Sequence, residues 1–180
     1  MATATAKKDD KMGMQAMMEM YRKLGTPGAP HKFLAKMEGS WNAKTKIWPE
    51  HGKPPIESSG TSEQKMLFGG RFLQQEFTGE MMGSPFTGIG ITGYDNGSNK
   101  YVSTWMDSTG TGILYFEGTA GTDGKTFTQE NRHNDPVRGP MTYRSVTRIV
   151  DEDTHVFEMY STIAKGKEEK TMEITYTRKR

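Results

Sequence analysis

Acidic residues at matching positions in two late segments are the part of this sequence whose spacing could support chemistry. If Lys165-Gly166 forms a two-residue hairpin turn, Glu158 faces Glu173 on the neighbouring strand. A pair of carboxylates can share the roles of general acid and general base, as in many isomerases and hydrolases. Glu158 and Glu173 are therefore the first candidates for catalysis in a pocket.

A second group of polar residues lies around a turn at residues 123–124. If residues 123–124 form a two-residue hairpin turn, Glu130 lies opposite Glu117 and Arg132 opposite Tyr115. Like charges directly opposite one another destabilise a sheet, so such a pair needs a cationic neighbour. Glu130 with Arg132 is the next candidate set, and Tyr115 could add contact surface for a ligand.

Arginines could neutralise the glutamate pair from a third strand. A three-residue loop before the ninth strand would place Arg148 opposite Glu158, with Arg144 two positions along the same face. The row Glu173, Glu158 and Arg148 would be a solvated charge ladder on the outside of a sheet. Inside a barrel, the same row would be a polar anchor whose charges must be paired. The spacing leaves both interpretations open.

Tryptophan opposite glycine marks a third candidate site. With residues 96–97 as a turn, Gly88 lies opposite Trp105, which shares a strand face with Tyr101. A glycine leaves room for an indole over bare backbone. Trp105 either covers a curved strand or lines a ligand pocket with Tyr101, and in both cases we expect it to be substantially buried.

Alternating residues punctuated by turn signals indicate that β-strands fill the chain after Gly39. Trp41, Ala43 and Thr45 share one face of the first strand, and glycine- or asparagine-containing turns recur along the rest. The predicted strands span residues 40–48, 57–68, 71–79, 85–94, 100–107, 112–120, 125–133, 141–150, 154–162 and 168–178.

Short connections determine the fold class. Parallel crossovers need about a dozen residues, so these strands must be antiparallel. A meander that closes on itself removes exposed edges. We therefore predict an all-β, up-and-down barrel of about ten strands. Side chains just fill a barrel of about eight strands, so about ten strands imply a cavity.

The segment before the strands has a helical period. From Asp9 to Leu24, large apolar residues recur at spacings of three and four, and a second short helical turn is predicted at residues 31–37. The methionine-rich helix either packs on the rest of the protein or serves as a plug, a lid or a partner-binding helix. We divide the chain into a tail and helix over residues 1–30 and a barrel domain over residues 31–180.

Composition excludes several function classes. The chain has no cysteine, so it has neither disulfides nor thiolate sites, and a formal net charge of +2 provides no field to recruit nucleic acid. The run GIGITG matches the dinucleotide fingerprint, but a turn and a strand follow it where a helix is required. We expect no metal site, no cofactor, no membrane span and a cytoplasmic location. The basic end, Arg178-Lys179-Arg180, is interpreted as a solvated tail.

The segments FLAKMEGSW, LFGGRFLQQEFTG, GSPFTGIGITGYDN, YVSTWMDSTGT, VFEMY and KTMEITYTR resemble an uncharacterised bacterial family of unknown function in the calycin, or lipocalin-like, superfamily. The resemblance runs from about residue 31 to the C-terminus. It implies a calycin-type β-barrel and carries no settled activity.

The leading hypothesis is a lipocalin-like protein that binds a small, partly apolar molecule in its cavity. One alternative is an isomerase or hydrolase that uses cavity carboxylates. Another is an interaction module that docks through the methionine-rich helix, including docking between copies in a homo-oligomer. The predicted ligand-binding residues are Trp105, Tyr101, Tyr115, Arg132, Arg144, Glu130, Glu158 and Glu173.

Overall fold

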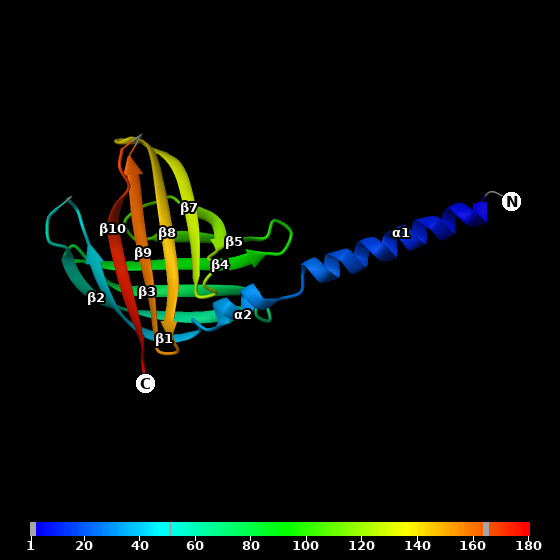
Figure 1. The fold of residues 1–180 in the computed structure, drawn as a ribbon, viewed down its shortest axis with the longest axis horizontal. Coiled ribbons are helices and arrows are strands. Elements are labelled where there is room, and N and C mark those ends of the chain that lie inside the picture. Colours follow the sequence, from blue (N-terminus) through cyan, green and yellow to red (C-terminus); the bar gives the residue numbers. More distant parts are fainter. Residues whose placement is uncertain (1–2, 51, 164–165) are drawn as a thin grey trace.

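Strand after strand folds back on its predecessor in the computed structural model, and the sheet closes into a barrel (Figure 1). The structure describes the backbone of residues 3–50, 52–163 and 166–180, and the side chains of residues 13–50, 52–162 and 166–180. Two helices precede the barrel, α1 (Thr3–Leu24) and α2 (Ala29–Ala35). The strands are β1 (Gly39–Ile47), β2 (Ile56–Leu67), β3 (Phe72–Met81), β4 (Ser84–Asp95), β5 (Lys100–Asp107), β6 (Leu114–Ala120), β7 (Thr126–Asp135), β8 (Gly139–Asp151), β9 (Thr154–Ile163) and β10 (Glu169–Arg178).

The topology is the predicted up-and-down meander. Each strand pairs in antiparallel fashion with the next one in the sequence, and β1 pairs with β10 to close the barrel. The predicted all-β class and strand order are confirmed, and the strand boundaries agree closely. The predicted helix over residues 9–24 begins earlier, at Thr3, and the short helix spans residues 29–35 instead of 31–37. The proposed division at residue 30 stays a prediction.

Several predicted cross-strand pairs are confirmed. Glu158 lies opposite Glu173, although position 165 of the predicted turn falls outside the described residues. Glu117 lies opposite Glu130 in the ladder between β6 and β7. That ladder runs from Glu117 to Ala120 on β6 and does not extend to Tyr115, so the predicted pairing of Tyr115 is wrong.

The register between β4 and β5 differs from the prediction. Asp95 pairs with Lys100, so the loop has four residues instead of two, and Trp105 lies opposite Gly90. The cause is local, because the Asp95 carboxylate accepts hydrogen bonds from the backbone N–H groups of Gly97 and Ser98 at 2.8 and 3.2 Å. Such side-chain bonds stabilise a wider turn.

The register between β8 and β9 also differs. An irregularity between Ile149 and Asp151 shifts the ladder, so Val146 lies opposite Glu158, and Arg148 lies opposite Val156. The predicted row of two glutamates and Arg148 is therefore wrong. A bulge of this kind adds a residue to one strand, which simple counting across a loop cannot reveal.

Helix α2 covers one end of the barrel. Leu34 is fully buried there in an apolar cluster with Leu73, Tyr101 and Phe127. The indole Nε1 of Trp41, at the start of β1, donates a hydrogen bond to the carbonyl after α2 (residue 37) at 2.9 Å. We call the opposite end of the barrel, where β1 ends and β2 begins, the far end.

The basic C-terminus does not behave as a solvated tail. The guanidinium of Arg178 lies 4.1 Å from the ring centroid of Trp41. It also donates hydrogen bonds to the carbonyls of Glu38, Lys36 and Glu152 at 2.9, 3.2 and 3.1 Å. Arg178 therefore ties β10, α2 and the turn between β8 and β9 together, and the expectation of a solvated residue was wrong at this position.

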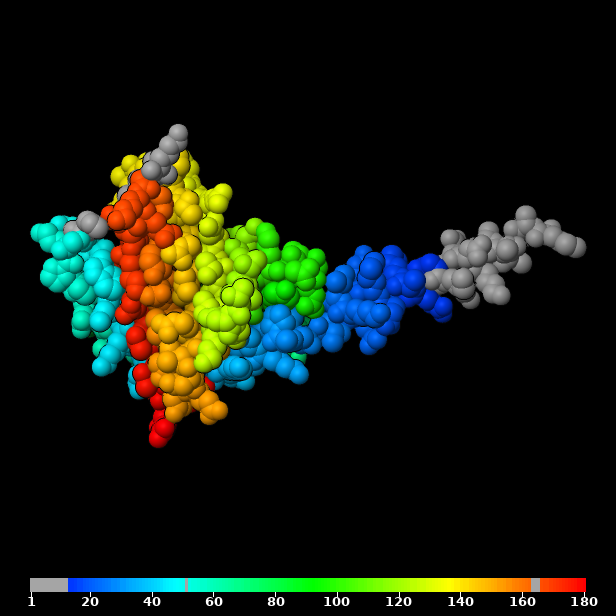
Figure 2. All heavy atoms as spheres, in the orientation of Figure 1, coloured from blue at the N-terminus to red at the C-terminus, as the bar shows by residue number. Residues whose placement is uncertain are grey.

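Helix α1 extends away from the barrel wall (Figures 1 and 2). Its connection to the barrel is anchored, because Asn96 donates hydrogen bonds to the carbonyls of Leu24 and Thr26 at 2.8 and 2.9 Å. Within the described part of the chain, neither helix combines the length and apolar character that a membrane crossing requires.

Candidate functional site

A set of uncharged polar side chains crosses the interior of the barrel. Gln75 donates hydrogen bonds to the hydroxyl oxygens of Ser62 and Tyr176 at 3.1 and 3.0 Å. Gln64 donates to Ser62 at 3.4 Å, and its Nε2 lies 3.3 Å from His155 Nε2. We call this set, together with Thr92, Ser103 and Gln129 on the opposite wall, the polar belt.

The belt continues on the opposite wall. Ser103 Oγ donates to Gln129 Oε1 at 2.8 Å, and the hydroxyls of Thr92 and Ser103 are 2.9 Å apart. Gln129 follows Phe127 on the inward face of β7 and is 4% exposed. Hydrogen-bonded belts of this kind are tolerated in a core only as far as each member is satisfied.

Three buried polar atoms among the described residues have no hydrogen-bond partner in the protein. They are Thr45 Oγ1, Gln129 Nε2 and His155 Nδ1. Leaving a buried donor unsatisfied costs about 1–3 kcal/mol, so native proteins rarely retain such atoms without a reason. Bound water or a ligand would relieve this cost.

His155 is enclosed by aromatic rings. Its ring stacks on Tyr176 and meets Trp41 edge-on, with both centroid distances at 4.4 Å. Burial, together with the positive charge of Arg178, lowers the pKa of His155 to about 3. The imidazole is therefore neutral at physiological pH, which suits hydrogen bonding more than charge pairing.

Trp105 forms an aromatic wall beyond the belt, toward the far end. Its indole lies against Gly88 and Gly90, and its Nε1 donates to Asp107 Oδ2 at 2.9 Å. Asp107 also accepts from the backbone N–H of Thr109 at 2.9 Å. Burial alone would raise the pKa of Asp107, but the hydrogen bonds from Thr109 and Trp105 outweigh it and lower that pKa. The indole is therefore held in one orientation by an ionised carboxylate.

Polar side chains of β7 and β8 continue the lining of the interior. His133 Nδ1 lies 2.7 Å from Asn131 Oδ1, and the rings of His133 and Tyr143 are 5.0 Å apart. Asn131 also donates to the carbonyl of residue 115 at 2.7 Å. These side chains share the inward parity of Phe127 and Gln129 on β7.

Toward the far end, inward-facing side chains are a mixture of buried ones, such as Phe86 and Met141, and partly exposed ones. Each of the following keeps intermediate exposure although its strand parity points it into the barrel: Trp105, Asn131, His133, Tyr143, Phe157, Met159, Ser161 and Met172. Around α2, Leu73, Tyr101 and Phe127 are buried, whereas Tyr94 and Ile149 are partly buried. Part of the inward-facing surface is therefore accessible, as expected for a barrel wider than about eight strands.

The predicted site residues divide between the two faces of the wall. Trp105 and Tyr101 face inward, as the pocket hypothesis required. Tyr101 lies in the apolar cluster under α2, stacked on Phe127 with centroids 4.5 Å apart, and burial raises its pKa to about 12. Trp105 is therefore the predicted residue that the structure brings to the accessible part of the interior.

Three predicted residues of β6 and β7 lie on the outer surface. Tyr115 is 51% exposed, and the side chains of Arg132 and Glu130 are 77% and 44% exposed. Arg132 and Glu130 form an ion pair at 2.9 Å. Any ligand that these side chains contact must bind outside the barrel.

Glu158 and Glu173 also lie on the outer face, on either side of a lysine that sequence reasoning did not single out. Lys170 contacts Glu158, and its Nζ lies 2.7 Å from Glu173 Oε2. Burial would lower the pKa of Lys170, but its hydrogen bonds to the two glutamates outweigh this and raise it to about 12. The pair is a charge-compensated ladder on the outside and does not supply carboxylates to the cavity.

Arg144, the last predicted residue, belongs to the same outer surface. Its guanidinium stacks 4.1 Å over the ring of Tyr160 and forms two hydrogen bonds of 2.7 Å to Glu168. The hydrogen bonds to Glu168 raise the pKa of Arg144 further. Arg144 is thus ion-paired and does not face the interior.

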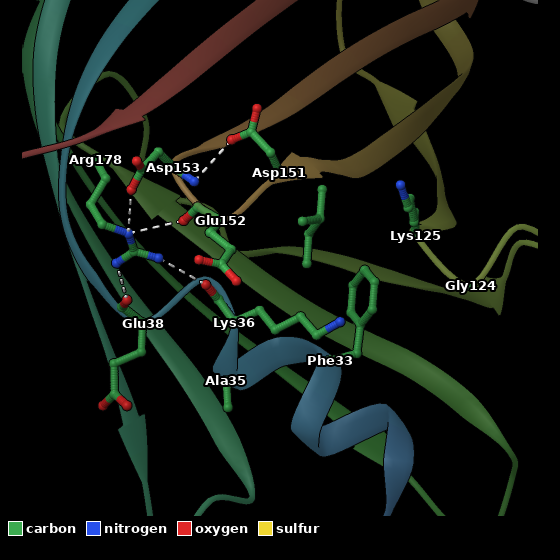
Figure 3. A pocket seen from close by; sticks show the side chains of 11 residues that line it. Phe33, Ala35, Lys36, Glu38, Gly124, Lys125, Asp151, Glu152, Asp153 and Arg178 are labelled. Carbon is green, nitrogen blue, oxygen red and sulfur yellow. Dashed lines mark hydrogen bonds and ion pairs between the residues drawn. The ribbon is translucent and has the colours of Figure 1, made fainter.

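A hollow of about 710 Å³ lies between α2 and the adjoining end of the barrel (Figure 3). Phe33 and Ile149 provide its apolar lining, and Lys36, Lys125 and Asp151 contribute charges of both signs. Arg178 forms part of its lining, with the hydrogen bonds described above drawn in Figure 3. None of the residues predicted as ligand contacts lines this hollow.

No group of three or more His, Asp or Glu side chains suited to a metal ion occurs among the described residues. The residues that sequence reasoning missed are the uncharged polar ones of the belt. The sequence does contain a sign of them. Gln129 lies two residues after Phe127 and therefore on the same face of its strand, and Gln64 lies on the same face as Ser62. Polar residues in register with an apolar face indicate a polar interior.

Comparison with solved structures supports the barrel fold. The crystal structure of Rv2717c from M. tuberculosis is 16% identical, covers 86% of this chain and 99% of its own, and superposes with a TM-score of 0.63. The S-type phycobiliprotein lyase CPES from Guillardia theta is 12% identical, covers 83% of this chain and 92% of its own, and gives a TM-score of 0.59. At these identities the likeness shows the fold alone.

Sequence comparison supplies the family. None of the curated proteins matches the chain. Residues 26–178 match the family described as "Protein of unknown function (DUF1579)". Since the match spans the whole barrel, from the residue after Gly25 to the end of β10, the chain belongs to the DUF1579 family.

Proposed function

We propose that the barrel binds a small, partly apolar molecule in its interior, between the polar belt and the far end. The observation that carries this proposal is the partial exposure of inward-facing side chains toward the far end, Trp105, Tyr143 and Met159 among them. Large apolar and aromatic side chains that face inward and keep part of their surface accessible are typical of a ligand pocket.

Trp105 is the proposed main contact surface. Its indole is fixed by the hydrogen bond to Asp107 and by the bare backbone of Gly88 and Gly90 behind it. A rigid aromatic wall offers a large contact area at little cost in conformational entropy. Methionines 159 and 172 on the facing strands β9 and β10 provide a softer surface that can adapt to the shape of a ligand.

Catalysis by Glu158 and Glu173 is not part of this proposal, because both lie on the outer face and are ion-paired with Lys170. One structure of the same fold is named a phycobiliprotein lyase, which shows that such a barrel occurs in an enzyme. For this chain we propose binding without assigning a reaction. We further propose that it acts in the cytoplasm, which cell fractionation would test.

Native mass spectrometry of the freshly purified full-length protein tests the proposal. We expect a co-purifying adduct of small-molecule mass. Ser161→Trp, which adds an indole on the inward face of β9, should abolish the adduct, and Thr162→Trp on the outer face should retain it. An adduct that survives Ser161→Trp in a folded protein would place the ligand elsewhere. Repeated empty spectra of the wild-type protein would refute binding of a resident ligand.

A second candidate function rests on α1. Its described residues expose six large apolar side chains, each between 42% and 64% exposed: Met14, Met17, Met18, Met20, Tyr21 and Leu24. Most helical stability in proteins comes from packing of an apolar face, and an exposed apolar stripe is typical of an interaction surface. Met14, Met17, Tyr21 and Leu24 follow the three–four spacing of a two-stranded coiled coil, so we propose α1 of a second copy as the partner.

A further inference from the structure

The charged side chains that face inward are confined to the two ends of the barrel. In the part of the chain that the structure describes, the inward parity of the strands selects Arg178 under α2, and Asp107, Asp135 and Glu169 at the far end. Every other Lys, Arg, Asp or Glu of the described strands lies at an outward position. Between the ends, the wall consists of apolar, hydroxyl, amide and imidazole groups.

An uncharged wall discriminates against charged ligands. A carboxylate or an ammonium group taken out of water and placed against this wall would find no counter-charge there, which is costly. An anion would also pass carboxylates at the far end. Hydrogen bonds from the backbone N–H groups of Arg138 and Val137 lower the pKa of Asp135, so this group is ionised at neutral pH, as Asp107 is.

The unpartnered atoms of the belt are hydrogen-bond donors. Gln129 uses its Oε1 to accept from Ser103, which leaves the Nε2 amide hydrogens without an acceptor. Gln64 Nε2 donates to Ser62 and faces His155 Nε2, so that Nε2 accepts and Nδ1 of His155 carries the proton. Gln129 and His155 are 4% and 3% exposed, so bulk water does not satisfy either donor.

The described part of the wall carries no charge between the ends, and it contains two buried hydrogen-bond donors without acceptors. We therefore propose that the ligand is an uncharged molecule that combines an apolar, ring-containing body with a carbonyl-type acceptor oxygen. The acceptor oxygen bonds the amide of Gln129, and the apolar body lies against Trp105. Anionic amphiphiles such as fatty acids are excluded. This inference rests on the proposed function and narrows it to one chemical class.

Three fluorescent probes that share one ring system separate the effects of an acceptor oxygen, a negative charge and the apolar body on binding. The first is a dimethylaminonaphthalene that carries a propionyl ketone. The second carries a carboxylate in place of the ketone, and the third is the parent dimethylaminonaphthalene without an acceptor. Titration of the full-length protein, followed by the emission shift of each probe, should show the ketone as the tightest ligand. We expect the carboxylate to bind at least about tenfold more weakly, because its charge is unpaired inside.

Two matched glutamine variants locate the acceptor contact. Gln129→Met should weaken binding of the ketone by about three- to tenfold and leave the parent naphthalene unchanged, since one hydrogen bond to an uncharged group is lost. Gln75→Met is the control, because Gln75 Nε2 is already bonded to Ser62 and Tyr176. It should leave the ratio of the ketone and parent affinities unchanged. Circular dichroism establishes that both variants are folded.

The outcomes separate this inference from the proposed function. A carboxylate that binds as tightly as the ketone, or a Gln129→Met variant that weakens all three probes equally, would overturn the assigned class. If no probe binds while native mass spectrometry shows a resident adduct, the class is wrong and the proposed function stands. If no probe binds and no adduct is found, both are wrong.

Discussion

The indole of Trp105 occupies the space in which a side chain at Gly88 would stand. A Cβ atom built on Gly88 would lie 2.3 Å from Trp105 Cζ2, far inside van der Waals contact. The two residues are not direct cross-strand partners, because Gly88 lies opposite Asp107 and Trp105 lies opposite Gly90. The indole therefore leans diagonally across β4, where two glycines make room for it.

Gly88→Ala tests this relationship. The added methyl group must displace the indole and its hydrogen bond to Asp107, so we expect a loss of about 1–3 kcal/mol in the free energy of unfolding. Gly112→Ala is a suitable control, because nothing lies within 4 Å of the Cβ position there. Urea denaturation provides the measurement. Equal stabilities of the two variants would show that the indole moves freely.

Lys170 should matter more to stability than an ordinary surface lysine. Lys170→Met removes the ammonium that contacts both Glu158 and Glu173, which lie opposite one another, and we expect a loss of about 1–2 kcal/mol. The triple variant Lys170→Met, Glu158→Gln, Glu173→Gln should recover most of that loss.

Lys100→Met is the control for this lysine. Lys100 pairs with Glu117 at 2.7 Å, but both side chains are at least 40% exposed, and such pairs contribute about 0–1 kcal/mol. Chemical denaturation at low and high salt measures all of these variants. Identical losses for Lys170→Met and Lys100→Met would refute the special role of the ladder.

His155 should make the protein less stable in mild acid. Its folded-state pKa of about 3 lies below the ordinary value of 6.5. In mild acid, His155 is therefore protonated in the unfolded chain and stays neutral in the folded one. The contribution of His155 to stability is therefore complete above its ordinary pKa of 6.5. It declines as the pH falls from 6.5 toward the folded-state pKa of about 3. Between about pH 7.5 and about pH 5.5, His155 alone should remove about 1.4 kcal/mol.

His155→Phe isolates this contribution, because phenylalanine keeps the ring stack on Tyr176 and cannot be protonated. Burial also lowers the pKa of His31, so some dependence in the same direction should remain in the variant. The quantity to compare is the drop in unfolding free energy between the two pH values. If wild type and variant lose the same amount, His155 is not held neutral in the fold.

Helix α1 should govern self-association and leave the barrel unaffected. Replacing Met17 and Tyr21 with glutamine removes two apolar contacts from the exposed stripe while keeping good helix propensity for the chain. Sedimentation velocity should show a shift toward monomer with an unchanged melting temperature. Glu19→Gln, on the same helix but outside the three–four stripe, is the control. A wild-type protein that is monomeric at high concentration would refute the second candidate function.

Much of the fold could be read from local signals. Glycine-containing turns mark where strands reverse, and strand alternation pairs each strand with its neighbour. The meander and the pairings Glu117–Glu130 and Glu158–Glu173 were therefore predictable. The inward placement of Trp41 and Ala43 follows from the same alternation. These features depend on residues close together along the chain.

Features that depend on distant residues could not be read in this way. Alternation separates the two faces of β9 but does not say which face is inside, because Glu158 and His155 are both polar. Only barrel closure places His155 inside and Glu158 outside, beside Lys170. The bulge after Ile149 and the wider turn after Asp95 then shift neighbouring strands, which moves Arg148 away from Glu158.

The sequence by itself determined an antiparallel ten-stranded barrel with a separate methionine-rich helix, since turn chemistry and strand period are properties of short segments. The tertiary structure alone decided that the interior between the two ends is lined by apolar and uncharged polar groups. It also decided that the predicted charged residues lie outside: Glu130, Arg132, Arg144, Glu158 and Glu173. The physical reason is that the inward face is chosen by closure and by the cost of burying charge, and both are properties of the whole sheet.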